Sequence, residues 1–298
     1  MDAQTQVMFQ QLLLRADQLL ERLDAFSPAK PPTVNWQAPA FRWRRKNDSG
    51  YLQAVVHFAD ICVDDLQNIG EQCRIVEQNT RQFVQGLPAN NVLLTGARGT
   101  GKSSLIRAML HQFKDQGLRL VEVEKTDLVD LPDIVEILAQ RPERFIVFSD
   151  DLSFEAGDAG YKVLKSTLDG SVAAAAQNVL VYATSNRRHL MPDFMSDNLQ
   201  ARHTETGEVH PGEAVEEKIS LSERFGLWVS FHSFTQSDYL NAVRHWVTVL
   251  SNAPASSADN LLAQARADAL RFTLERGSRS GRVALQFARH WVGSRQLG

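Results

Sequence analysis

The chain has 298 residues, of which 43% are hydrophobic and 22% charged, and its formal net charge is −3. This length makes one large or two modest domains, and the charge argues against a bulk attraction to nucleic acid. Two cysteines, Cys62 and Cys73, exclude a disulfide framework and an all-cysteine zinc site. The N-terminus lacks a secretory-signal pattern and no stretch could span a membrane, so we expect a reducing cytoplasm.

Residues 1–60 are expected to form a helical N-terminal region with a proline-rich linker. Leucines recur at helical spacing over residues 5–26, whereas residues 27–40 contain prolines that exclude a regular helix. The following "FRWRRK" (Phe41 to Lys46) mixes aromatic and basic residues, which is compatible with a nucleic-acid contact or with a solvated basic turn. Residues 51–86 are expected to be largely helical.

Strands and helices alternate in the middle of the chain. Strand-like runs occur at residues 91–94, 118–124, 145–149, 178–184 and 227–234. Helical stretches separate the first four runs, which predicts a parallel five-stranded sheet with helices on both faces. We therefore expect an α/β nucleotide-binding core over residues 61–234.

Residues 235–298 are expected to form a small all-helical domain. The pattern predicts helices over residues 236–250, 258–276 and 281–293. Thr235 and Asp238 have the pattern of an N-terminal cap, and Gly277 fits the position just after a helix.

A phosphate-binding loop is the clearest functional signal. The segment "GARGTGKSS" fits G-x-x-x-x-G-K-[ST] and lies between an apolar strand and a helical stretch. Its backbone N–H groups and the helix N-terminus would bind phosphate, Lys102 would reach the β and γ oxygens, and Ser103 would bind Mg²⁺. The alternative is a plain glycine-rich surface turn. The predicted loop residues are Gly96, Ala97, Arg98, Gly99, Thr100, Gly101, Lys102, Ser103 and Ser104.

Two carboxylates follow the apolar strand "FIVFS". Asp150 would hold Mg²⁺ through water, and Asp151 would orient or deprotonate the attacking water. The alternative is that the pair caps the next helix. Glu155 is a second candidate base, or a solvated residue.

Polar residues follow the next strand. Asn186 could hydrogen-bond the γ-phosphate or the water, or simply form a turn. Arg187 and Arg188 could steer phosphate or acidic partners, or lie on the surface.

Arginines near the C-terminal end are further candidates. Arg224 in "SERFG" could stabilise charge on the γ-phosphate of a neighbouring subunit, or pair with acids such as Glu213, Glu216 or Glu217. In "RGSRSGR" (Arg276 to Arg282), Arg279 and Arg282 could lie over the nucleotide, or form an exposed basic turn.

Taken in order, these stretches resemble the AAA+ ATPases over about residues 60–295. The resemblance implies Walker A at Gly96 to Ser103, Walker B at Asp150 and Asp151, sensor 1 at Asn186, an arginine finger at Arg224, sensor 2 at Arg279 or Arg282, and an adenine pocket near Ile69 and Gly70. "ANNVLLTGARGTGKSSL", "FSDDLSFE" and "SERFGL" also resemble a bacterial group of ATP-binding proteins catalogued as a domain of unknown function.

The resemblance implies a P-loop NTPase fold, ATP or ADP with Mg²⁺ as cofactors, and a homo-oligomer that shares nucleotide sites between subunits. Two functions stay open: an ATPase that remodels a macromolecular partner, or an ATP-gated switch, adaptor or loader that binds DNA or protein. Asp151 stands where most members have glutamate, which favours slow turnover. Residues 196–222 are expected to form an exposed loop, which could bind an unknown protein or nucleic-acid partner.

Overall fold

A computed structural model describes residues 15, 33–46, 49–56, 58, 61–154, 158–169, 176–186, 190, 202–203, 209–210, 221 and 223–296. The strands are β1 (Ala40–Lys46), β2 (Ser49–Ala54), β3 (Val92–Gly96), β4 (Leu118–Glu122), β5 (Arg144–Ser149), β6 (Val179–Ser185), β7 (Arg202–His203), β8 (Val209–His210) and β9 (Leu227–Phe231). The α-helices are α2 (Gly70–Val84), α3 (Lys102–Phe113), α4 (Leu131–Ala139), α5 (Ala159–Leu168), α8 (Gln236–Leu250), α9 (Ala258–Arg276) and α10 (Gly281–Gln296). Short 3-10 helices are η1 (Val63–Asp65), η2 (Lys114–Gln116), η3 (Lys125–Asp130) and η4 (Ala255–Ser257).

The main sheet has the strand order β2-β1-β4-β5-β6-β3-β9. All five strands predicted from the sequence are present and pair in parallel. β6 lies between β3 and β5. The end of β6 is therefore flanked by the glycine-rich loop after β3 and by the carboxylates after β5.

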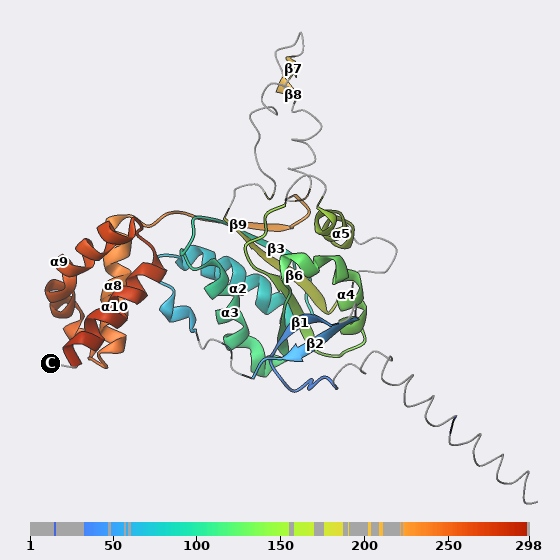
Figure 1. The fold of residues 1–298 in the computed structure, drawn as a ribbon, viewed down its shortest axis with the longest axis horizontal. Helices are drawn as coiled ribbons and strands as arrows, with labels where there is room; N and C mark the ends of the chain where they lie inside the picture. The colour runs from blue at the N-terminus through green and yellow to red at the C-terminus, as the bar shows by residue number, and fades with distance from the viewer. Residues whose placement is uncertain are drawn as a thin grey trace, which may run out of the picture.

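Helices cover both faces of this sheet, as the alternating pattern predicted (Figure 1). Successive side chains of a strand point to opposite faces. Leu93 accordingly packs with the buried residues of α4 and α5, whereas Val92 and Leu94 pack with those of α2 and α3. The sheet is thus buried on both sides, which explains its nearly continuous apolar strands.

The sheet has seven strands rather than five, because residues 40–54 form a hairpin on its edge. β1 pairs antiparallel with β2 and parallel with β4. Phe41 and Trp43 are buried beneath the sheet and are unavailable for stacking on bases. The expectation of a helical region with a linker is therefore wrong for these residues. A Cβ at Gly50 would lie 1.8 Å from the Trp43 ring, so only glycine fits there.

The three arginines of "FRWRRK" are paired with acids that follow β4 or end it. Arg42 contacts Glu122 at 2.9 Å and Arg44 contacts Glu124 at 3.1 Å. Arg45 also lies 3.4 Å from an acid, Asp130 in η3. The segment is therefore a strand with ion-paired arginines rather than the solvated basic turn that the sequence suggested.

Residues 51–86 are helical only in their second half. β2 ends at Ala54, and α2 begins at Gly70 after the short turn η1. The predicted helix over residues 5–26 lies outside the described residues apart from Arg15, as does the proline-rich stretch before residue 33. Most of the segment 196–222 is also outside them, although β7 and β8 form an antiparallel pair within it.

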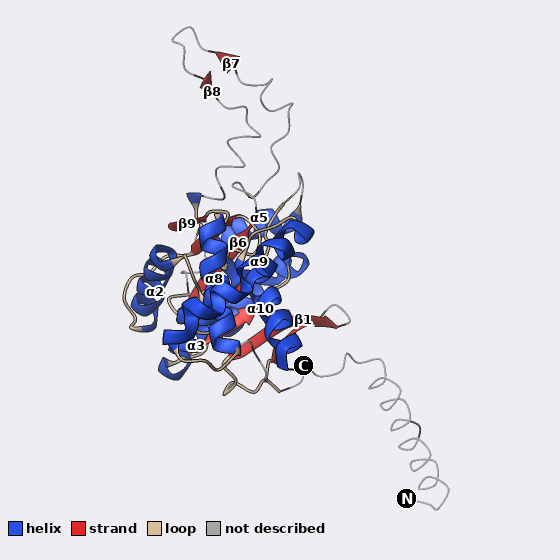
Figure 2. Ribbon diagram, turned by 90° about the vertical axis from the view of Figure 1, so that its left-hand side faces the viewer, coloured by secondary structure: helices blue, strands red, loops and turns tan. Residues whose placement is uncertain are grey.

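Three helices, α8, α9 and α10, form the C-terminal part, close to the predicted ranges. Thr235 and Asp238 make the expected capping box, and Gly277 ends α9 in the left-handed conformation. The helices share their own apolar cluster and lie beside the sheet core, in front of it in Figure 2. Within the described residues, no helix has the length and apolar character needed to cross a membrane.

Candidate functional site

The glycine-rich loop runs from the end of β3 to the start of α3. Gly96, Gly99 and Gly101 all have positive φ angles, between 76° and 128°. A Cβ at Gly96 would lie 1.9 Å from the Phe231 carbonyl oxygen, so β9 approaches the loop too closely for any other residue. The loop therefore turns tightly at its glycines and leads directly into the N-terminus of α3.

Lys102 is the most enclosed charged residue of the site, with 6% of its surface exposed. Its Nζ donates to the carbonyl oxygens of Gly96 and Ala97, both at 2.7 Å, and to Asn186 Oδ1 at 3.0 Å. Burial lowers the pKa of this amine, although the nearby carboxylates oppose the shift. The ammonium group is thus held against the loop by three hydrogen-bond acceptors.

Ser103 and Asp150 meet at the start of α3. The Ser103 hydroxyl donates to Asp150 Oδ1 at 2.6 Å, and the Thr184 hydroxyl donates to the same oxygen at 2.5 Å. These hydroxyl and carboxylate oxygens are ligands that suit Mg²⁺. Among the described residues, no group of three or more His, Cys, Asp and Glu side chains could hold a metal. A site with one carboxylate fits Mg²⁺, which is usually held together with phosphate oxygens and water.

Asp151 is held in an unusual backbone conformation. Its φ is 54°, and its N–H donates to the Thr184 hydroxyl at 2.9 Å. Its carboxylate accepts a short hydrogen bond from the Asn186 amide and lies 3.5 Å from Arg98 Nη2. Asn186 therefore connects Asp151 to Lys102. Because β5 and β6 are neighbours, Asp151 and Asn186, the two residues predicted to position water, lie in contact.

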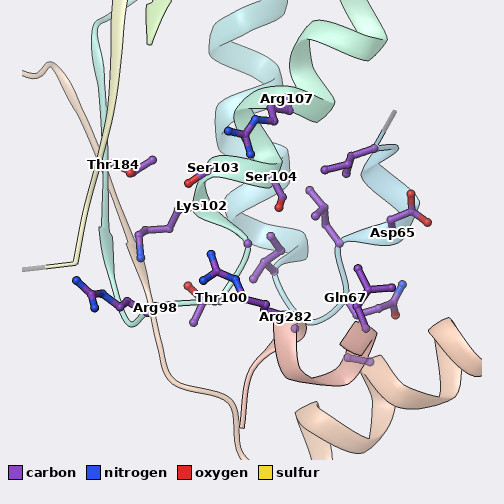
Figure 3. Close-up of a pocket in the computed structure, with 18 of the residues that line it drawn as sticks. Asp65, Gln67, Arg98, Thr100, Lys102, Ser103, Ser104, Arg107, Thr184 and Arg282 are labelled. Carbon is purple, nitrogen blue, oxygen red and sulfur yellow. The ribbon is translucent and has the colours of Figure 1, made fainter. Parts of the chain in front are cut away.

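A cavity of about 580 Å³ lies over these residues, between the sheet core and the C-terminal helices. Figure 3 shows the glycine-rich loop on one side and the segment with Asp65 and Gln67 on the other, with Arg282 between them. Of the predicted residues, the cavity is lined by Ile69, Arg98, Gly99, Thr100, Gly101, Lys102, Ser103, Ser104, Asp150, Asp151, Asn186 and Arg282.

Other predicted residues do not line the cavity. Gly70 begins α2 just outside it, and Gly96 and Ala97 contribute their carbonyl groups beneath the loop. Arg279 is exposed, whereas Arg282 lines the cavity from the start of α10. Of the two arginines between which the sequence could not choose, Arg282 is therefore the one that lines the cavity. Glu155, Arg187 and Arg188 lie outside the described residues.

Several lining residues were missed by sequence reasoning. Thr184 could have been noticed two residues before Asn186, because strand ends are where this fold gathers polar groups. Asp65, Leu66 and Gln67 belong to the stretch "VDDLQNIGEQ", which resembles the adenine-pocket segment of the AAA+ ATPases, although they were not singled out. The others come from just before this stretch, from α3, and from α8, α10 and the connection before α8, where no local pattern marks them. These residues are Ile61, Asp65, Leu66, Gln67, Arg107, Phe234, Ala242, Trp246, Gly281 and Leu285.

The segment before α2 is hydrogen-bonded to α8. The Asn68 amide donates to the Asp238 carbonyl oxygen, and the Asn241 amide donates to Asn68 Oδ1, both at 2.8 Å. His245 of α8 lies 3.2 Å from Asp65 Oδ1. Both segments line the cavity, so a ligand there would contact two parts of the chain that are already joined by hydrogen bonds.

Arg224 lies away from this cavity, at the opposite end of the sheet. β9 begins at Leu227, opposite Val92, and its Phe231 pairs with Gly96. Four residues of strand span about 13 Å, and Arg224 precedes that span. Its Nε donates to Asp169 Oδ1 at 2.5 Å. The acids that the sequence suggested as partners, Glu213, Glu216 and Glu217, lie outside the described residues.

Comparison with known proteins gives one family and several solved structures. The model of the family described as "Protein of unknown function (DUF815)" matches residues 36–295. Among curated proteins, none matches the chain.

The solved structures are distant in sequence. One is a chain of the HORMA:CdnC:Trip13 complex of E. coli MS115-1, with 12% identity, a TM-score of 0.47, and coverage of 76% of this chain and 90% of that one. The Thermotoga maritima RuvB Holliday junction branch migration motor has 12% identity and a TM-score of 0.41, with 76% and 70% covered. C. elegans PCH-2 has 14% identity and a TM-score of 0.44, with 79% and 72% covered.

Proposed function

We propose that this chain, which belongs to the family DUF815, binds ATP with Mg²⁺ and hydrolyses it slowly. The observation that carries the proposal is the buried Lys102, held on the glycine-rich loop within reach of Asn186 and beside the Ser103–Asp150 pair. An ammonium group, a hydroxyl and a carboxylate in this order suit a metal-bound triphosphate. Their position at the end of a parallel sheet, with a helical part beside it, agrees with the AAA+ resemblance.

The residues of the cavity have separable roles in this proposal. Lys102 exchanges its carbonyl contacts for phosphate oxygens, and Ser103 and Asp150 hold the metal. When bound, Mg²⁺ neutralises charge that develops on the phosphates. Asp151 orients the attacking water or accepts its proton, and Asn186 fixes that carboxylate.

The base and ribose are expected to lie toward the apolar end of the cavity. Ile69 and Leu66 line it on the core side, and Leu285 and Trp246 line it on the helical side. Because both parts of the chain contact the ligand, exchange of ATP for ADP would change how the helical part sits on the core. We propose that this change remodels or releases a macromolecular partner.

Arg224 is proposed to act on the nucleotide of a neighbouring copy. Its position beyond the amino end of β9 keeps it from the nucleotide of its own chain. A guanidinium group directed at the γ-phosphate stabilises charge in the transition state. The proposal therefore requires a homo-oligomer with nucleotide sites shared between subunits.

A switch that binds ATP but hardly hydrolyses it is the second candidate. Asp151 is one methylene shorter than glutamate, and in this structure its carboxylate is engaged by Asn186 and Arg98. Water held less closely would react slowly, because catalysis tolerates little misplacement. The chain would then act as an ATP-gated adaptor or loader for protein or DNA.

Steady-state ATP hydrolysis at several protein concentrations, with Mg²⁺, tests the proposal. Lys102→Ala is expected to abolish turnover and ATP binding, and Arg224→Ala to lower turnover by about a thousandfold, to a measurable residual rate, without loss of binding. Specific activity that rises with protein concentration would support the shared site. Tight, Lys102-dependent binding without turnover would favour the switch, and absence of binding would refute both functions.

A further inference from the structure

The turn that carries Arg224 is anchored in the core. The Arg224 N–H donates to the Leu221 carbonyl oxygen at 3.2 Å. Leu221 and Phe225, on either side of Arg224, are 0% and 3% exposed and pack in the same apolar cluster as α4 and α5. The backbone at Arg224 therefore has little freedom relative to the sheet.

Gly226, two residues after Arg224, fits tightly against the loop before β3. A Cβ at Gly226 would lie 2.4 Å from Asn90 Oδ1. Asn90 is itself fixed, because the Asn79 side chain bonds both its N–H and its carbonyl oxygen. Asn79 also donates to the buried Tyr182 hydroxyl at 2.9 Å. The turn thus rests on a hydrogen-bonded base that reaches β6.

The Arg224 side chain is held by the end of α5. Asp169 caps this helix, and its N–H donates to the Lys165 carbonyl oxygen at 3.1 Å. The Asp169 carboxylate accepts a charge-assisted hydrogen bond from Arg224 Nε. The Asp169 side chain is 43% exposed and the Arg224 side chain 24%, so the pair lies at the surface, where a second molecule could approach it.

We propose that Asp169 is a positioning residue, which holds Arg224 in the orientation needed to reach the nucleotide of a neighbouring subunit. This inference rests on the shared site of the proposed function. Asp169 touches Arg224 rather than the reacting atoms, so it acts only through the arginine. A guanidinium group already fixed in each subunit stabilises the transition state without an ordering step during assembly.

The test combines substitutions with subunit mixing in the full-length protein. Asp169→Ala is expected to lower kcat for ATP about tenfold or more, because small misplacements of a catalytic group are costly, while KM stays unchanged. In the Arg224→Ala background the same change is expected to have no further effect. Asp169→Glu, which keeps the carboxylate, is expected to restore part of kcat.

Mixing variant subunits distinguishes a loss of Arg224 positioning from damage to the nucleotide site of the Asp169→Ala subunit itself. Lys102→Ala subunits have no active site of their own but keep Arg224 and Asp169. Added to Asp169→Ala subunits, they are expected to raise turnover above the sum of the separate activities. Asp268→Ala is the matched control, since it removes another exposed Asp–Arg pair, with Arg271, on the far helical part. This control is expected to match the parent protein.

Five results would overturn the inference. Parental kcat in Asp169→Ala, or an equal loss in both arginine backgrounds, would refute the role of Asp169 and leave the shared site intact. Parental turnover in Arg224→Ala, or no turnover in the parent protein, would refute the shared site together with the inference. Failure of mixing to restore turnover would assign the defect to the variant's own site.

Discussion

Arg282→Ala is expected to weaken ATP binding by about tenfold to hundredfold. Arg282 lines the cavity from the start of α10, and its positive charge helps to lower the pKa of Lys102 in the glycine-rich loop. The base of its side chain lies beside the loop, since a Cβ at Gly99 would lie 3.5 Å from Arg282 Cβ. One charge-assisted hydrogen bond to a phosphate contributes about 1.5–3 kcal/mol, and each 1.4 kcal/mol changes Kd about tenfold.

The assay is titration of a fluorescent ATP analogue with Mg²⁺ at fixed ionic strength. Arg279→Ala is the matched control, because Arg279 has the same charge, lies three residues earlier and is exposed outside the cavity. Its loss is expected to change Kd by about twofold or less, since exposed charges are screened by salt. Equal weakening in both variants, or none in Arg282→Ala, would refute the assignment of Arg282 to the phosphate.

Tyr182→Phe removes a hydroxyl that bonds Asn79 and Thr80 in the core, so the free energy of unfolding is expected to fall by about 1–2 kcal/mol in urea titrations; an unchanged value would show that the bonds contribute nothing. Burial raises the pKa of Cys73 from 9.0 to about 11, so iodoacetamide at pH 8 is expected to modify the exposed Cys62 and to spare Cys73 until unfolding. Because the unfolded Cys73 thiol ionises first, its contribution to stability is fully present below pH 9 and is lost as pH rises to about 11. A Cys73→Ala variant should lack that part of the alkaline loss.

Local patterns of the sequence predicted the core strands and the C-terminal helices. Alternating and helical periodicities report which side chains are buried, and burial is what fixes these elements. Gly277 and the pair Thr235–Asp238 were readable as helix ends because capping is a contact over a few residues. Lys102 and Ser103 could be predicted for the same reason, since the loop motif is contiguous.

The hairpin at the sheet edge escaped prediction although its signal was present. Phe41 and Trp43 alternate with Arg42 and Arg44, which is the period of a strand. The partners of this strand are β4, some 80 residues later, and acids such as Glu122. Without that pairing, the basic residues suggested a solvated or nucleic-acid-binding segment.

The sequence by itself thus determined the five core strands, the C-terminal helices and the loop motif, because their causes act over a few residues. Only the tertiary structure decided that β6 lies between β3 and β5, which brings Thr184 and Asn186 to the carboxylates. It also decided that Arg282 rather than Arg279 faces the cavity, and that Arg224 pairs with Asp169 at the far end of the sheet. These outcomes depend on strand order and on packing between segments far apart in the chain, which no local pattern records.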